Sequence, residues 1–204
     1  MKIKLNKITH EIKPASELTV KEYLQFVRID GQGRIIMRNF KGYIDYVLTY
    51  LSITLNVKFS EILRYKLDNS TIVRILSFIG IIESYEEIKK HELPKSFYFD
   101  GKIKQIAKMD IYPVGVRWLM ESKIELNNVE HSVYLLSILL LDEFDRDRAE
   151  SNYNSLLELN YLRVLPLAAF FLRNLQKIMN KEKKFSSLRI VAFITNTLRK
   201  LIQS

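Results

Sequence analysis

Two stretches of mostly apolar residues place the strongest constraint on how this chain can fold. Val133–Leu141 is apolar apart from Ser137, and Val164–Leu172 has no charged side chain, so each stretch covers nine residues. A membrane-spanning helix needs about 20 apolar residues, so neither stretch is long enough to cross a bilayer. A helix that is apolar on all sides must be covered by the rest of a protein. We therefore expect two buried helices and no membrane span.

Local signals predict two β-hairpins among the helices. Asp100-Gly101, inside 97–104, favours the positive φ angles of a type I′ turn. The partial alternation of apolar and polar residues on both sides of Asn6-Lys7 predicts a second pair of short strands before Pro14. The expected fold class is α+β and predominantly α-helical, with a small N-terminal β-hairpin and a mid-chain β-hairpin packed on a helical bundle.

Capping residues and apolar spacing predict the helices. Thr19-Val-Lys-Glu22 has the form of a capping box, in which a hydroxyl and a carboxylate satisfy free N–H groups at a helix start. Pro166 fits the first turn of a helix. The expected helices begin at Thr19, Ser60 and Asp68 and cover 40–55, 116–120, 133–141, 152–161, 166–180 and 185–202. A length of 204 residues favours a single compact domain over 1–204.

The positive charge is concentrated at the C-terminal end. Residues 1–160 carry 23 Lys and Arg against 22 Asp and Glu, whereas 161–204 carry nine against one. On a helical wheel Arg173, Lys177 and Lys181 form a row opposite an apolar side. We expect 161–204 to form a basic C-terminal helical pair. Its candidate contact residues for a partner or nucleic acid are Arg173, Lys177, Lys181, Lys183, Lys184, Arg189, Phe193 and Lys200.

This basic surface has three interpretations. It is an ordinary solvated helix face, a contact for an acidic protein surface, or a contact for the phosphates of nucleic acid. No helix-turn-helix, zinc-finger or aromatic–glycine RNA-binding motif accompanies it. Nucleic-acid binding by 173–200 is therefore the alternative to protein contact.

The sequence shows no catalytic or metal-binding motif. The absence of Cys excludes disulfides, thiolate zinc sites and cysteine nucleophiles. His10, His91 and His131 are far apart in the sequence, whereas metal ligands normally cluster. The acidic stretch 142–150 lacks the spacing of a calcium loop and fits a solvated helix start. We expect no enzymatic activity, no cofactor and no metal, with a small enzyme that lacks a known motif as a third hypothesis.

Several segments follow one another in a distinctive order: Leu-Thr-Val-Lys-Glu-Tyr at 18–23, Val-Lys-Phe-Ser-Glu-Ile at 57–62, the hairpin at 97–104 and Leu-Pro-Leu-Ala-Ala-Phe-Phe at 165–171. This layout resembles small proteins of tailed bacteriophages that serve tail or baseplate morphogenesis, including baseplate hub assembly factors and tail assembly chaperones. The resemblance implies a non-enzymatic virion structural or assembly protein, located in the virion or the host cytoplasm. Its partners would be tail, portal or baseplate proteins, with homo-oligomers and DNA contact left open. The basic final helix at 185–203 departs from that pattern and favours a structural role over a chaperone role.

Overall fold

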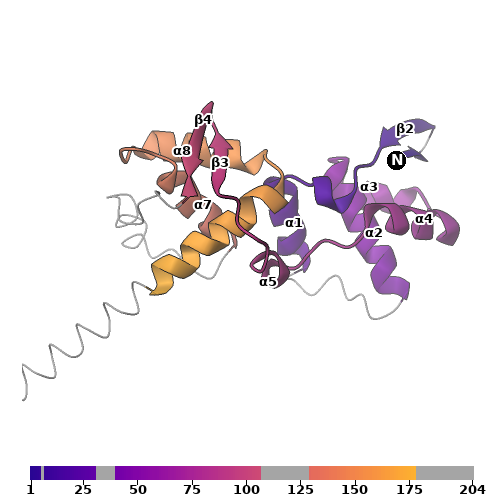
Figure 1. The fold of residues 1–204 in the computed structure, drawn as a ribbon. Coiled ribbons are helices and arrows are strands. Elements are labelled where there is room, and N and C mark those ends of the chain that lie inside the picture. The colour runs from indigo at the N-terminus through magenta and orange to yellow at the C-terminus, as the bar shows by residue number, and fades with distance from the viewer. Residues whose placement is uncertain (6, 31–39, 107–128, 178–204) are drawn as a thin grey trace, which may run out of the picture.

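A computed structural model describes residues 1–5, 7–30, 40–106 and 129–177. These residues form a mainly helical fold with two separate two-stranded antiparallel sheets, which confirms the predicted fold class. In Figure 1 the helix α1 (Val20–Asp30) lies between two groups of elements, one formed by the first half of the chain and one by the second.

The first group packs around a central helix, α2, which contacts α1, α3 and α4. Tyr46, Val47, Tyr50 and Leu51 of α2 are almost fully buried, so this helix forms the middle of the core. The hairpin before it was predicted correctly, as was a helix close to 40–55. The group consists of β1 (Lys2–Leu5), β2 (Ile8–Glu11), the 3-10 helix η1 (Ala15–Glu17), α2 (Phe40–Thr54), α3 (Phe59–Arg64) and α4 (Asn69–Ile79).

The second group contains both apolar stretches as buried helices, as predicted. Most residues of α7 are buried, including both of its serines. The last described helix covers 161–177, and nearly all of its first half is buried. The mid-chain hairpin is also confirmed, because Asp100 and Gly101 have φ angles of 48° and 71°. The group consists of α5 (Tyr85–Ile88), β3 (Ser96–Phe99), β4 (Lys102–Gln105), α7 (Val129–Leu139), α8 (Arg146–Leu157) and the 161–177 helix.

Two backbone segments far apart in sequence join the groups. The Val20 N–H donates to the Leu159 carbonyl at 2.8 Å, and the Tyr161 N–H donates to the Leu18 carbonyl at 3.0 Å. These bonds enclose an isolated antiparallel bridge between residues 19 and 160. We call this contact the 18–20/159–161 junction. It fixes the start of α1 against the start of the 161–177 helix.

Four tyrosines extend the junction into the core, and we call them the buried tyrosine cluster: Tyr23, Tyr46, Tyr50 and Tyr161. The rings of Tyr23 and Tyr161 stack with their centroids 4.8 Å apart. The hydroxyl of Tyr46 donates to the Gly80 carbonyl at 3.0 Å, and that of Tyr50 donates to a backbone carbonyl at 2.9 Å. Each ring thus fills the core while its hydroxyl satisfies a backbone group.

The capping box at the start of α1 is confirmed. The Thr19 N–H donates to the Glu22 carboxylate at 2.8 Å, and the Glu22 N–H donates to the Thr19 hydroxyl at 3.3 Å. Asp68 also caps α4 as predicted, since its side chain accepts from the Thr71 N–H at 2.7 Å. The prediction that Ser60 caps a helix is wrong. α3 begins at Phe59, and its N-cap residue is Lys58, whose carbonyl accepts the first helical hydrogen bonds.

This difference between Thr19 and Ser60 predicts different costs of substitution. We expect Thr19→Ala to lower the free energy of unfolding by about 1 kcal/mol, because it removes a side chain that caps a helix. Ser60→Ala should change it by less than about 0.5 kcal/mol, because Ser60 is exposed inside a helix and caps nothing. Urea unfolding followed by circular dichroism measures both. Equal losses in the two variants would contradict the assignment of the caps.

Two predicted helices in the second group have wrong boundaries. The helix expected at 152–161 is α8, which ends at Leu157 and begins at Arg146, because the Asp145 side chain caps it. The interpretation of the acidic stretch 142–150 as a helix start is therefore correct. The next helix begins at 161, since the Asn160 side chain accepts from the Leu162 N–H at 3.0 Å. Pro166 therefore lies in the second turn of the helix and not in the first. The helices predicted at 116–120 and 185–202 lie outside the described residues.

Candidate functional site

Only part of the predicted basic surface lies within the described residues. Arg173 and Lys177 are exposed on the 161–177 helix. Leu167, Phe171 and Leu175 are buried on its other side, which is the arrangement that the helical wheel predicts. The other predicted contact residues lie outside the described part of the chain: Lys181, Lys183, Lys184, Arg189, Phe193 and Lys200.

Arg173 makes a contact within the fold. Its guanidinium donates to the backbone carbonyl of Lys89 at 3.1 Å, and Lys89 is the C-cap residue of α5. A cation at a helix C-terminus is favourable because the last carbonyls carry partial negative charge. Arg173 therefore helps to hold α5 against the 161–177 helix. Lys177 lies one turn further along the helix and is also exposed.

In Figure 1 the segment 91–96 crosses the 161–177 helix. Residues of this segment and of the helix together line two grooves. The two grooves have volumes of about 220 and 610 Å³. Both are lined by Pro94 and Ser96, so one strip of backbone separates them. The smaller groove is also lined by His91, Glu92, Phe97, Tyr98, Leu162, Arg163 and Pro166, and the larger one by Lys95, Gln105, Ile106 and Phe170.

The margins of these grooves are mainly basic. Lys95 and Arg163 line them and are exposed, whereas Glu92 is their only carboxylate among the described lining residues. Arg173 lies three residues beyond Phe170 on the same helix, and residues at that spacing are neighbours on a helix surface. We call Lys95, Arg163, Arg173 and Lys177 the basic margin. It presents cations along the described length of the 161–177 helix.

The mid-chain hairpin places an apolar pair beside the smaller groove. Tyr98 and Ile103 face each other across β3 and β4 and are 59% and 70% exposed. Phe97 and Phe99 point to the opposite side and are buried. The outer face of the hairpin therefore offers an aromatic and a branched side chain to water, held in place by a buried inner face.

Two lysines of β4 are directed away from this outer face. The Lys104 ammonium lies 2.5 Å from the Asp142 carboxylate, and the Lys102 ammonium lies 3.8 Å from it. The hydrogen bond from Lys104, together with the positive charge of both lysines, lowers the pKa of Asp142. These pairs tie the hairpin to the connection between α7 and α8.

His91 and Asp145, which the sequence offers as possible metal ligands, have structural contacts instead. The Nε2 atom of His91 lies 2.6 Å from the Glu83 carboxylate. The Asp145 side chain caps α8. Within the described residues, no three His, Asp or Glu side chains lie close enough together to hold a metal ion.

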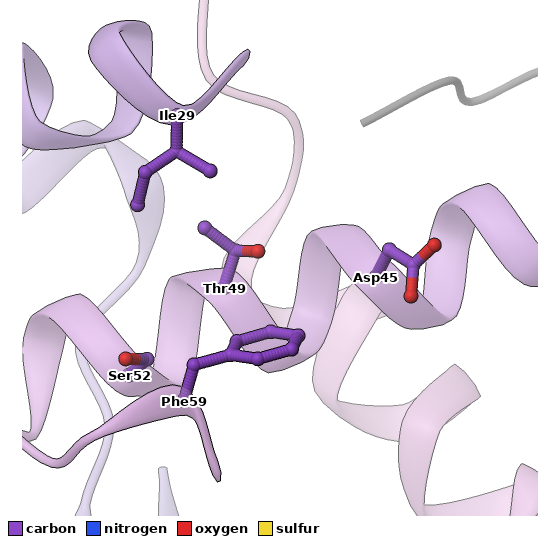
Figure 2. Close-up of a pocket in the computed structure, with 5 residues that line it drawn as sticks. All are labelled: Ile29, Asp45, Thr49, Ser52 and Phe59. Carbon is purple, nitrogen blue, oxygen red and sulfur yellow. The ribbon is translucent and has the colours of Figure 1, made fainter. Parts of the chain in front are cut away.

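A third hollow lies between α1, α2 and α3 and was not predicted from the sequence (Figure 2). It has a volume of about 280 Å³. Ile29 of α1 and Phe59 of α3 form its walls, and Asp45, Thr49 and Ser52 line it from α2. The spacing of these three polar residues in a mostly apolar helix was the available signal. We call this hollow the Asp45 cavity.

The comparisons with known proteins assign no family. No family model matches the chain, and the searches of curated proteins and of solved structures give no significant match. Among the described helices, none has the length and apolar character needed to span a membrane.

Proposed function

We propose that this chain is a non-enzymatic structural or assembly protein of a bacteriophage tail or baseplate and acts through protein–protein contacts. The resemblance in layout supports the phage assignment. The observation that supports protein contact is the exposed Tyr98–Ile103 pair next to the basic margin. Aromatic residues and Arg are enriched among the residues that dominate interface affinity.

In this proposal the basic margin and the Tyr98–Ile103 pair have different roles. The basic margin attracts an acidic partner from a distance, because surface charge raises association rates more than it raises affinity. The Tyr98–Ile103 pair then loses its contact with water against an apolar part of that partner. The buried Phe97 and Phe99 keep the hairpin rigid, so little conformational entropy is lost on binding.

Nucleic-acid binding is the second candidate, favoured by the exposed row of Arg173 and Lys177. Because Arg173 also holds α5 through the Lys89 carbonyl, its replacement would disturb the fold as well as the surface. Lys177 and Arg163 are therefore better positions for a charge reversal.

The experiment compares the wild-type chain with the double variant Arg163→Glu, Lys177→Glu in cells that produce the phage encoding it. We expect the wild-type chain to copurify with particles or with tail, portal or baseplate proteins, as identified by mass spectrometry. The double variant should be recovered at about one tenth of that level or less, since it replaces two cations by anions on the docking surface.

Arg74→Glu serves as the matched control, because Arg74 is an exposed residue of α4 in the other group of elements. A wild-type chain that stays a monomer and copurifies with none of these proteins would contradict the proposal. Binding of duplex DNA that weakens steeply with salt and is lost in the double variant would favour the second candidate.

A further inference from the structure

The Asp45 cavity is built from three separate segments of the chain (Figure 2). Asp45, Thr49 and Ser52 follow one another at the i, i+4, i+7 spacing that places side chains on one helix face. Ile29 and Phe59 face this strip from α1 and α3. The volume of about 280 Å³ is near the lower end of pockets that hold small molecules, which suits one long side chain.

The Asp45 cavity combines apolar walls with a single carboxylate among its described lining residues. Phe59 is 39% exposed although its ring is large and apolar, and Thr49 is buried at 3%. The Ser52 hydroxyl already donates to the Val57 carbonyl at 2.7 Å. The carboxylate of Asp45 is the one charged group among the described lining residues. Within the described part of the chain, no cation lies within 4.0 Å of it.

Another groove, separate from the two at segment 91–96, continues the cavity along α2. It has a volume of about 540 Å³ and shares Ile29 and Ser52 with the Asp45 cavity. It is also lined by Lys58 and by Arg28, which pairs with Glu130. The Asp45 carboxylate therefore lines the cavity, whereas the two cations line the adjoining groove. A peptide segment can lie in the groove while one of its side chains enters the cavity.

We propose that the Asp45 cavity binds a lysine or arginine side chain of another protein. The aliphatic stem of that side chain would lie between Ile29 and Phe59, and its charged end would meet the Asp45 carboxylate. Lys and Arg commonly bury their stems along apolar surface while the charged head stays at a polar group. This inference goes beyond the proposed function, because it assigns a second contact surface with the opposite charge preference.

Other occupants fit the cavity less well. A purely apolar side chain would remove water from the Asp45 carboxylate without a compensating charge or hydrogen bond, which is costly. An anionic group would add repulsion to this cost. A cationic group is the occupant that satisfies both the apolar walls and the carboxylate.

The test uses the full chain with isotope-labelled methyl groups and NMR detection at Ile29 and Thr49. The probes are N-acetyl-arginine amide, N-acetyl-lysine amide and the neutral N-acetyl-norleucine amide, each titrated into the tens of millimolar range. We expect saturable shifts for the two cationic probes and affinity about tenfold weaker for the neutral probe. Equal binding of the neutral probe, or no shift with either cationic probe, would overturn the proposal.

Asp45→Asn keeps the size of the side chain and removes its charge, so cationic probes should bind it about tenfold more weakly. Glu61→Gln is the matched control, because Glu61 is an exposed residue of α3 outside the cavity. Unchanged binding in Asp45→Asn would reject the carboxylate as the recognition group. Concentration-dependent self-association of the wild-type chain that Asp45→Asn abolishes would overturn the assignment to a different protein and identify a second copy. None of these outcomes depends on the basic margin, so the binding proposal for the Asp45 cavity and the proposed function are tested independently.

Discussion

Replacement of Tyr161 by alanine should lower the free energy of unfolding by about 3–5 kcal/mol, the range for buried aromatic side chains. Tyr161 is 1% exposed, and its ring stacks on that of Tyr23 with 4.8 Å between centroids. Its N–H also makes one of the hydrogen bonds of the 18–20/159–161 junction. The lost side chain would leave a cavity where the two groups of elements meet, and urea unfolding measures the loss.

Tyr161→Phe is the control for this prediction. It retains the ring and the stacking contact and removes only the hydroxyl, so the loss should stay below about 1.5 kcal/mol. A similar loss in both variants would mean that the hydroxyl, and not the packing of the ring, stabilises the contact between the two groups.

Alkaline pH should unfold the protein in a single cooperative step that begins near pH 10. Burial raises the pKa of Tyr46 and of Tyr161 to about 12. Burial also raises the pKa values of Tyr23 and Tyr50. Below pH 10 these tyrosines are protonated in both states, so they do not change stability. Between pH 10 and 12 only the unfolded chain loses these protons, which favours unfolding.

The expected loss is large compared with the stability of a typical domain. A pKa of about 12 for Tyr46, against about 10 in the unfolded chain, corresponds to about 3 kcal/mol by pH 12. The other buried tyrosines act in the same direction, so the loss is a large part of the 5–15 kcal/mol of stability that domains commonly have.

The helical circular dichroism signal should therefore be lost between pH 10 and 12, and it should return when the pH is lowered. Tyr46→Phe cannot ionise at this position, so the alkaline midpoint should shift to higher pH in that variant after correction for its stability at neutral pH. A helical signal that is fully retained at pH 12 would contradict the prediction.

Elements whose signals are local could be predicted from the sequence. The Thr19–Glu22 capping box and the Asp68 cap each involve residues three positions apart. The Asp100-Gly101 turn needs only two residues with positive φ. Ser84 and Glu87 form a capping box for α5 in the same way. The sequence therefore also contains the signal for this short helix, which was not predicted.

Features that depend on distant segments could not be predicted. The 161–177 helix begins where Asn160 caps it and where Leu18 accepts a backbone hydrogen bond, and the second partner is more than 140 residues away. The helical wheel placed Arg173 on the surface correctly. The wheel could not show that the Arg173 guanidinium donates to the Lys89 carbonyl. The Asp45 cavity likewise requires three helices to meet before its lining residues form a site.

The 18–20/159–161 junction can form only late in synthesis, because one of its two segments is made long after the other. Leu18 and Val20 leave the ribosome early, but their hydrogen-bond partners, Leu159 and Tyr161, follow only after about 140 further residues. At translation rates of about 5–20 residues per second, the start of α1 waits roughly 7–28 s for these partners. During this interval the surface that later receives Tyr161 is uncovered. Nascent chains stalled before residue 159 should therefore be more sensitive to proteases near α1 than the completed protein.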